Sequence, residues 1–176
     1  MNSLDNILFR FIYGLAHQNR FFDGLIVFFA GYFQYILLIL AVFLLFAKIK
    51  DWRRQLYVFS VFSLSAILSR GLITEIIRFF YDRTRPFLAL DFTPLIHNFN
   101  GSFPSGHMAF YFALALSVFL MNRKWAWFFV YGVILMGLAR IAAGIHWPSD
   151  ILGGILIAIL SYFIVKKILP SQNKTA

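Results

Sequence analysis

Residues 22–46 read FDGLIVFFAGYFQYILLILAVFLLF, an apolar run with a single charged residue, Asp23. Because the hydrocarbon core of a bilayer is about 30 Å thick, a helix needs about 20 mostly apolar residues to cross it. This run is long enough, and four further apolar runs follow it. They extend from Leu56 to Phe80, His107 to Met121, Trp125 to Ala143 and Ile151 to Val165. The sequence therefore predicts an all-α integral-membrane bundle of five transmembrane helices.

The composition of the chain favours the same class. Of the 176 residues, 61% are hydrophobic and only 13% are charged, whereas soluble domains carry about 25% charged residues. This apolar excess is more than a soluble core of that length could bury. The chain contains no Cys, which excludes a disulfide framework and a zinc–thiolate site.

The first 20 residues have a different pattern. Between Leu4 and Ala16 the apolar residues recur at helical spacing, with Asn6 and Arg10 on a polar side. We expect this amphipathic helix to lie in the membrane interface. If it inserted into the membrane instead, the bundle would have six spans. Residues 170–176 are expected to be a disordered tail, and residues 1–176 to form a single domain.

The basic residues indicate how the bundle is oriented. Positive charge gathers in the loops after the first and third spans and after the fifth span, and these connections would all lie on one side of the membrane. The residues are Lys48, Lys50, Arg53, Arg54, Arg123, Lys124, Lys166, Lys167 and Lys174. Since cytoplasmic loops hold the excess of Lys and Arg, the net charge of +9 is mainly topological, and no nucleic-acid partner is implied.

Polar residues collect at the opposite end of the predicted helices. Arg78 lies near the end of the second span, Arg85 follows that span, and Arg140 lies near the end of the fourth. Guanidinium groups match the oxygens of a phosphate and stay charged at any relevant pH. Ser105 offers a hydroxyl before the third span, and Gly106 allows a close approach to the helix N-terminus. These five residues predict a phosphate-binding site.

Two histidines supply the groups that bond cleavage requires. His146 precedes Pro148 and Asp150, so the fifth span should begin near Pro148 with the carboxylate close to the imidazole. Asp150 would hold one ring nitrogen protonated and leave the other free to attack phosphorus. His107 would protonate the departing oxygen and later activate the water that cleaves the phosphohistidine. The predicted catalytic residues are thus His146, His107 and Asp150.

Three ordered motifs carry a family resemblance. They are Arg78, six residues, Arg85-Pro86; then Pro104-Ser105-Gly106-His107; then Arg140, five residues, His146, three residues, Asp150. In this respect the chain resembles the type-2 phosphatidic acid phosphatases, which are membrane lipid phosphatases.

The resemblance implies that His146 is the nucleophile, supported by Asp150, and that His107 is the acid. It also implies phosphate binding by the three Arg residues, with no metal and no cofactor. Two positions depart from the family pattern, since Arg78 stands in place of Lys and Ala139 in place of a frequent Ser.

Within the family the chain looks most similar to bacterial undecaprenyl diphosphate phosphatases. We therefore expect a multi-pass protein of the cell membrane that faces the extracytoplasmic side and produces undecaprenyl phosphate. Phosphatidylglycerophosphate, phosphatidate and lipid A phosphatases share the motifs and stay open as alternatives. Hydrolysis of soluble phosphate esters and non-enzymatic lipid binding or transport are the other hypotheses. The sequence carries no signal for the oligomeric state.

Five further polar residues have other expected roles. Arg70 and Glu75 lie inside the second span and are expected to form a buried ion pair or a polar contact between helices, with support of Arg78 as the alternative. Arg83, with its neighbour Asp82, is expected to shape the loop. His97 lies in a polar loop outside the motifs and is expected to be solvated.

Overall fold

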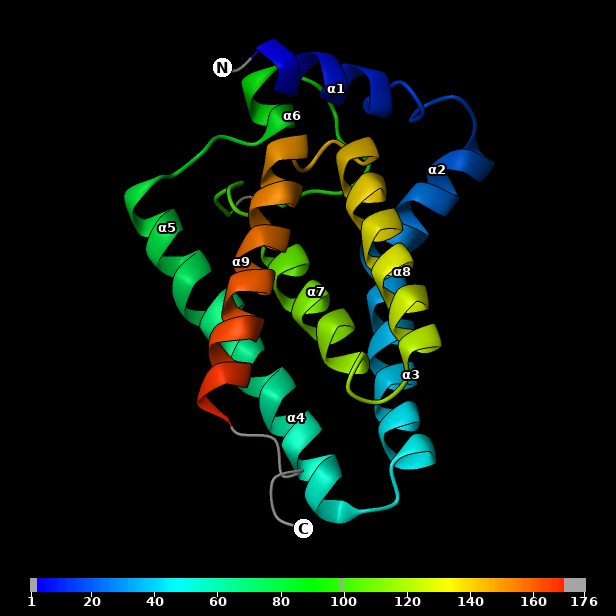
Figure 1. Cartoon of the computed structure of the whole chain (residues 1–176). Helices are drawn as coiled ribbons and strands as arrows, with labels where there is room; N and C mark the ends of the chain where they lie inside the picture. Colours follow the sequence, from blue (N-terminus) through cyan, green and yellow to red (C-terminus); the bar gives the residue numbers. More distant parts are fainter. Residues whose placement is uncertain (1–2, 99, 170–176) are drawn as a thin grey trace.

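The computed structural model is helical and describes residues 3–98 and 100–169. Within these residues there is no strand, and the helices run in two groups that meet around one central helix, α7 (Figure 1). The chain begins with α1 (Ser3–Tyr13), which lies across one end of the bundle. The all-α class is therefore confirmed.

Two long continuous helices form the first half. The first joins α2 (Arg20–Val27), a π-helical segment at Phe28–Tyr32 and α3 (Phe33–Lys48) into 29 residues. The second joins α4 (Trp52–Ala66), a π-helical segment at Ile67–Ile73 and α5 (Thr74–Phe80) into another 29. At about 1.5 Å per residue each helix is longer than a ~30 Å hydrocarbon core is thick, so each is long enough to cross it even when tilted.

The short α6 (Pro86–Ala89) leads through a loop to the second half, which contains α7 (Gly106–Val118), α8 (Arg123–Ala142) and α9 (Pro148–Ile168). Four of the helices are long and apolar enough to cross a membrane, and α7 is a shorter apolar helix of 13 residues. Most of α7 is buried, chiefly against α8 and α9. Its first turn lies deeper in the bundle than the first turn of α9 (Figure 1).

Close packing of α7 on α9 depends on Gly154. A Cβ atom at this position would lie 2.5 Å from the Ser105 carbonyl oxygen and 2.7 Å from Met108 Cβ. Small residues at such crossings let helix backbones approach within a membrane. This contact fixes the start of α7 against the first turns of α9, which is where the polar residues gather.

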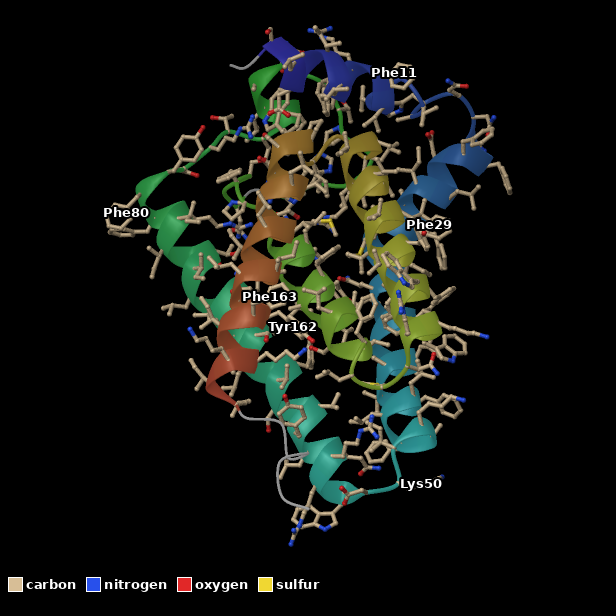
Figure 2. All side chains as sticks on the ribbon, in the orientation of Figure 1. Phe11, Phe29, Lys50, Phe80, Tyr162 and Phe163 are labelled. Carbon is tan, nitrogen blue, oxygen red and sulfur yellow. The ribbon has the colours of Figure 1, made fainter. Side chains whose placement is uncertain are left out.

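The outer surface of the bundle is apolar. Large side chains such as Ile39, Phe43, Leu156 and Phe163 are 59–70% exposed, and Phe80 and Phe163 project outward in Figure 2. Soluble proteins rarely leave so much contiguous apolar surface in water. The molecule is therefore a membrane protein whose exterior faces lipid.

The predicted helix ends differ from the observed ones at polar positions. The first span was expected over 22–46 and extends over 20–48, and the second over 56–80 extends over 52–80. In both cases a capping side chain, Asn19 or Asp51, starts the helix before the apolar run. The third span ends at Val118 rather than Met121, and the fourth covers Arg123–Ala142.

The fifth span begins at Pro148, as predicted, and extends beyond its apolar run, Ile151–Val165, at both ends. It covers 21 residues, Pro148–Ile168, because polar residues at its start and Lys166 and Lys167 at its end are helical. The N-terminal helix ends at Tyr13 rather than Ala16. The tail predicted to be disordered, 170–176, falls outside the described residues, and the single-domain assignment stays a prediction.

Candidate functional site

His146 lies in the turn between α8 and α9, and the first turn of α9 fixes its ring. Asp150 accepts a hydrogen bond from the Trp147 backbone amide at 2.8 Å. The same oxygen, Oδ2, lies 3.3 Å from His146 Nδ1. His146 is 1% exposed and Asp150 is fully buried, so the imidazole has a defined orientation.

Hydrogen-bond donors surround the Asp150 carboxylate. Ser102 Oγ donates to Oδ2 at 2.5 Å, and Arg83 Nη1 donates to Oδ1 at 2.8 Å. Donors on both oxygens favour the ionised carboxylate, which can only accept. His146 Nδ1 must then carry the hydrogen, and Nε2 is left with its lone pair. This is the protonation state that a nucleophilic imidazole needs.

Arg85 approaches His146 from the opposite side. Its Nη1 lies 3.5 Å from His146 Nε2, and three backbone carbonyls hold the guanidinium, those of Asn100, Gly101 and Ile145. Burial, followed by the positive charge of Arg78, lowers the pKa of Arg85 to about 10, while Asp150 opposes the change. Arg85 therefore remains a cation at neutral pH beside the free nitrogen of His146.

Arg78 and Arg140 complete a cluster of guanidinium groups. Arg78 Nη2 donates to the Pro104 carbonyl at 3.0 Å, and Arg140 Nη1 donates to the Ala30 carbonyl, in the first π-helical segment, at 2.7 Å. In the part of the chain that the structure describes, Arg85 and Arg140 form no ion pair, although both are at most 4% exposed. Buried cations held by neutral carbonyls favour an anionic ligand.

The unpartnered polar atoms point to the same ligand chemistry. Among the described residues, the buried side-chain atoms without a hydrogen-bond partner include Arg78 Nε, Arg140 Nε and Ser105 Oγ. These three donors belong to residues predicted to bind phosphate. Buried donors are normally satisfied, and the oxygens of a phosphate would accept from all of them.

Ser105 and Gly106 bring the start of α7 to this cluster. Ser105 N donates to the Asp150 carbonyl at 3.0 Å, which ties the motif to α9. A Cβ at Gly106 would lie 2.4 Å from Arg70 Nε, so any side chain there would require the Arg70 side chain to move. Both residues are buried, and they lie at the start of α7.

His107 occupies the first turn of α7 but faces a neighbouring cavity. This cavity, of about 240 Å³, is lined by Gln34, Arg70, Gly106, His107, Phe110 and Tyr111. No hydrogen bond joins His107 to another predicted site residue within residues 3–98 and 100–169. The structure thus brings His146, Asp150 and Arg85 into direct contact and places His107 at the adjoining cavity.

The sequence interpretation missed two partners of Asp150. Arg83 was expected only to shape the loop, yet its guanidinium reaches Asp150, and Ser102 was not singled out. The sequence does contain a signal for Arg83. Side chains two residues apart in an extended segment point the same way, and Arg85, a predicted site residue, lies two residues after Arg83. Ser102 carries no comparable signal, since its contact depends on the loop path.

The remaining expectations have mixed outcomes. Arg70 and Glu75 form the expected ion pair, but their side chains are 39% and 52% exposed rather than buried. Glu75 also lies 3.8 Å from Arg78 Nη1, as the alternative interpretation expected. His97 is exposed and packs against Phe87. No group of three or more His, Asp or Glu side chains among the described residues is placed to hold a metal ion.

Comparisons with known proteins identify relatives over most of the chain. Residues 56–174 match the model of the PAP2 superfamily. Undecaprenyl-diphosphatase BcrC of Bacillus subtilis is 33% identical over 160 residues, which cover 89% of this chain and 80% of the relative.

Two solved structures share the fold. LpxE of Aquifex aeolicus superposes with a TM-score of 0.76 at 26% identity, covering 94% of this chain and 96% of that one. A transmembrane PAP2-type phosphatidylglycerolphosphate phosphatase of Bacillus subtilis superposes with a TM-score of 0.66 at 22% identity, covering 95% and 87%.

Proposed function

The chain belongs to the PAP2 superfamily and is a membrane-bound hydrolase of lipid phosphates, and we propose that it acts through a phosphohistidine formed on His146. One observation carries the proposal. The Nδ1 atom of a buried imidazole is held by Asp150, while Nε2 faces the guanidinium of Arg85 in a cluster of buried cations. A phosphate bound by those cations would have its phosphorus in front of a free nitrogen lone pair.

The reaction has two displacement steps. In the first, the Nε2 lone pair of His146 forms a bond to phosphorus, and the bond to the bridging oxygen breaks with its electron pair on the departing group. His107 gives that oxygen a proton. Asp150 stabilises the imidazolium that carries the phosphoryl group. In the second step His107 removes a proton from water, the water oxygen bonds to phosphorus, and the Nε2–phosphorus bond breaks to release inorganic phosphate.

Arg78, Arg85 and Arg140 stabilise the charge on the phosphoryl oxygens during both steps. Their forked donors fit the non-bridging oxygens, and Ser105 and the amides at the start of α7 add further donors. These cations supply the charge that a metal ion would otherwise provide. The proposal therefore requires no metal, and a chelator should leave turnover unchanged.

An apolar cavity offers a route for the lipid chain. A cavity of about 400 Å³ is lined by Phe62, Ser63, Ala66, Ile67, Arg70, Gly71 and Phe110. It shares Arg70 and Phe110 with the cavity in front of His107. A lipid could keep its tail between α4 and α7 while its phosphate reaches the cations, which supports sideways entry from the bilayer.

Arg70 favours a diphosphate substrate over a monophosphate. Its side chain lies against Gly106, where the apolar cavity meets the cavity of His107. In a lipid diphosphate the phosphate that stays on the lipid must pass this junction, and a guanidinium there could bind it. Together with the 33% identity to a protein named an undecaprenyl-diphosphatase, this supports undecaprenyl diphosphate as the substrate.

The charge distribution supports an extracytoplasmic site in the cell membrane. The ends of α3, α8 and α9 away from His146 carry Lys48, Arg123 and Lys166, and Lys50 lies at that same end in Figure 2. Cytoplasmic loops hold such excess positive charge. The site at the opposite end would then act on lipid carried in the outer leaflet.

Phosphate release and trapping of the intermediate test the proposal together. Protein purified in detergent with chelator is given undecaprenyl diphosphate, phosphatidylglycerophosphate, phosphatidate and lipid A 1-phosphate. We expect release to be fastest from the diphosphate, with an acid-labile, alkali-stable phosphoryl label on the quenched protein. His146→Ala should lose both signals and bind the lipid normally. Full turnover in folded His146→Ala would disprove the nucleophile.

A further inference from the structure

The helix α1 contributes a buried carboxylate close to the active site. Asp5 is 6% exposed, although most of the helix around it is open. Its Oδ1 accepts a hydrogen bond from Ser149 N at 3.0 Å, and its Oδ2 accepts one from Ser149 Oγ at 2.6 Å. Asp5 thereby satisfies donors in the first turn of α9, the turn that also carries Asp150.

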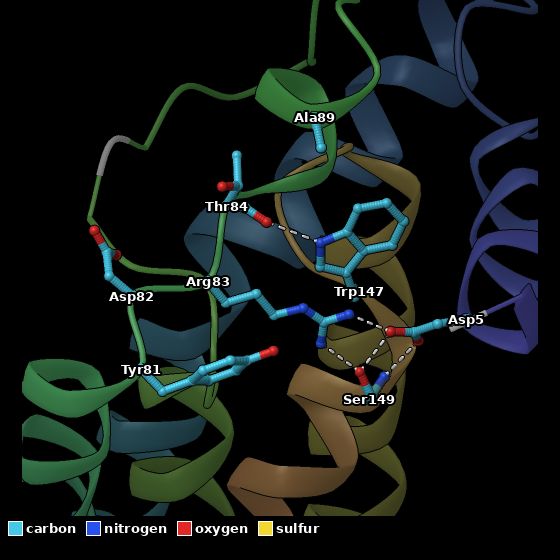
Figure 3. A pocket seen from close by; sticks show the side chains of 8 residues that line it. All are labelled: Asp5, Tyr81, Asp82, Arg83, Thr84, Ala89, Trp147 and Ser149. Atoms are coloured by element: carbon cyan, nitrogen blue, oxygen red, sulfur yellow. Dashed lines mark hydrogen bonds and ion pairs between the residues drawn. The ribbon is translucent and has the colours of Figure 1, made fainter. Parts of the chain in front are cut away.

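Arg83 joins this carboxylate to the one that holds His146. Its Nη2 donates to Asp5 Oδ2, and its Nη1 donates to Asp150 Oδ1 and to Ser149 Oγ. Figure 3 shows the guanidinium reaching from the loop toward Asp5 and Ser149, with the Trp147 ring above it. The Arg83 Cζ atom lies 5.4 Å from the centroid of that ring. Arg83 is thus fixed by contacts with two segments, α1 and the start of α9.

The two oxygens of Asp150 are not equivalent. Oδ2 accepts from Ser102 Oγ, Trp147 N and His146 Nδ1, whereas Oδ1 has a single hydrogen-bond donor within residues 3–98 and 100–169, Arg83 Nη1. Leaving a buried carboxylate oxygen without a donor costs about 1–3 kcal/mol or more. Loss of Arg83 would therefore favour rotation of the carboxylate away from the orientation that aims Oδ2 at His146.

Packing of α1 against the start of α9 holds Asp5 in place beside Arg83. Phe9, one turn after Asp5, is 1% exposed and packs against Trp147 with the rings tilted and their centroids 5.1 Å apart. Asp5 lies well before residue 56, where the PAP2 match begins. A segment outside the matched domain therefore reaches the machinery that orients the nucleophile.

We propose that Asp5 and Arg83 are positioning residues that set the orientation of Asp150 and, through it, of the His146 imidazole. This inference rests on the proposed role of His146. Neither residue needs to contact substrate, so both should act on the rate of the chemical step and leave phosphate binding unchanged. Their effects should also depend on each other, because Asp5 acts through Arg83.

A double-mutant cycle on the full chain in detergent tests the proposal. The variants are Asp5→Asn, Arg83→Gln and their combination, with Asp91→Asn as a matched control on an exposed carboxylate. We expect kcat to fall about 10-fold or more in Arg83→Gln, in line with the cost of small misplacements at active sites. Asp5→Asn should lower kcat several-fold, with KM and the inhibition constant of inorganic phosphate unchanged.

The combined variant should be no slower than Arg83→Gln alone. Losses that multiply, or a folded Asp5→Asn with wild-type kcat, would overturn the proposal. If Asp5→Asn does not fold, Arg83→Lys decides, because one ammonium cannot reproduce the forked contact to two carboxylates. A lower kcat in Arg83→Lys, with the inhibition constant of inorganic phosphate unchanged, would support the proposal. An unchanged kcat in this variant would refute it. An active His146→Ala would instead refute the proposed function itself.

Discussion

At the residue scale, burial sets the charge state of His146. Burial lowers its pKa from 6.5 to about 4. The hydrogen bond to Asp150 raises the pKa, but Arg140 and Arg85 add to the lowering. Because the lowered pKa belongs to a base, the ring is neutral above about pH 4 and becomes protonated only below it. An ordinary histidine would already be half protonated at pH 6.5.

We expect the His146 ring to remain neutral, with hydrogen on Nδ1, in protein held at pH 5.5. The measurement is the ¹⁵N shifts of labelled His in detergent, with His146 assigned by comparison with His146→Ala. The exposed ring of His97 is observed in the same spectra as the internal control for complete labelling. Protonation of His146 at pH 6 or above would contradict the burial argument.

Residue-level reasoning found the groups with a recognisable chemical role and missed those defined by tertiary contacts. The link between His146 and Asp150 is four residues long and follows from a proline that starts a helix, so the sequence predicts it. Arg83 reaches Asp5 across 78 residues. Neither hydropathy nor helical spacing encodes that contact, which depends on where the loop and α1 come to rest.

At the element scale, hydropathy located every long helix but misplaced the ends. The helix α9 begins at Pro148, as the pattern of Pro148 and Asp150 predicts, whereas its apolar run begins only at Ile151. Capping favours polar residues at helix starts, so an apolar run marks the middle of a membrane helix better than its boundary. The π-helical segment at Ile67–Ile73 was also not predicted. It contains Arg70, and such segments are frequent at functional sites.

The contact of α7 with α9 gives a prediction at this scale. Gly154→Ala would place a methyl group 2.5 Å from the Ser105 carbonyl oxygen, which forces the helices apart. We expect a destabilisation of about 1–3 kcal/mol, typical of overpacking, and slower phosphate release because Ser105 and Asp150 move apart. The measurements are the thermal midpoint in detergent and the initial rate.

Gly24→Ala is the matched control for this prediction. A Cβ there meets nothing within 4 Å, and the position lies within α2. This substitution should leave the rate unchanged and stabilise the protein by up to about 1 kcal/mol, since Ala favours helix more than Gly does. Equal effects of the two substitutions would show that the α7–α9 contact is not critical.

At the scale of the whole molecule, positive charge serves two purposes at opposite ends. Exposed basic residues such as Arg53 lie at the end that we propose to be cytoplasmic, where such an excess of positive charge would set the topology. The buried guanidinium groups of Arg85 and Arg140 lie at the other end, where carbonyls orient them. The net charge of +9 alone does not separate these roles. The burial and the hydrogen-bond partners of each basic residue separate the two roles.

The position of Arg70 between the apolar cavity and the His107 cavity predicts selectivity for diphosphates. We expect Arg70→Gln to lower kcat/KM for a long-chain lipid diphosphate about 10-fold, the loss of roughly one charged hydrogen bond. The corresponding monophosphate has no second phosphate at the junction, so its kcat/KM should change little. Arg53→Gln, at the far end of the bundle, should affect neither substrate. Equal losses on both substrates would instead assign Arg70 to the support of Arg78 through Glu75.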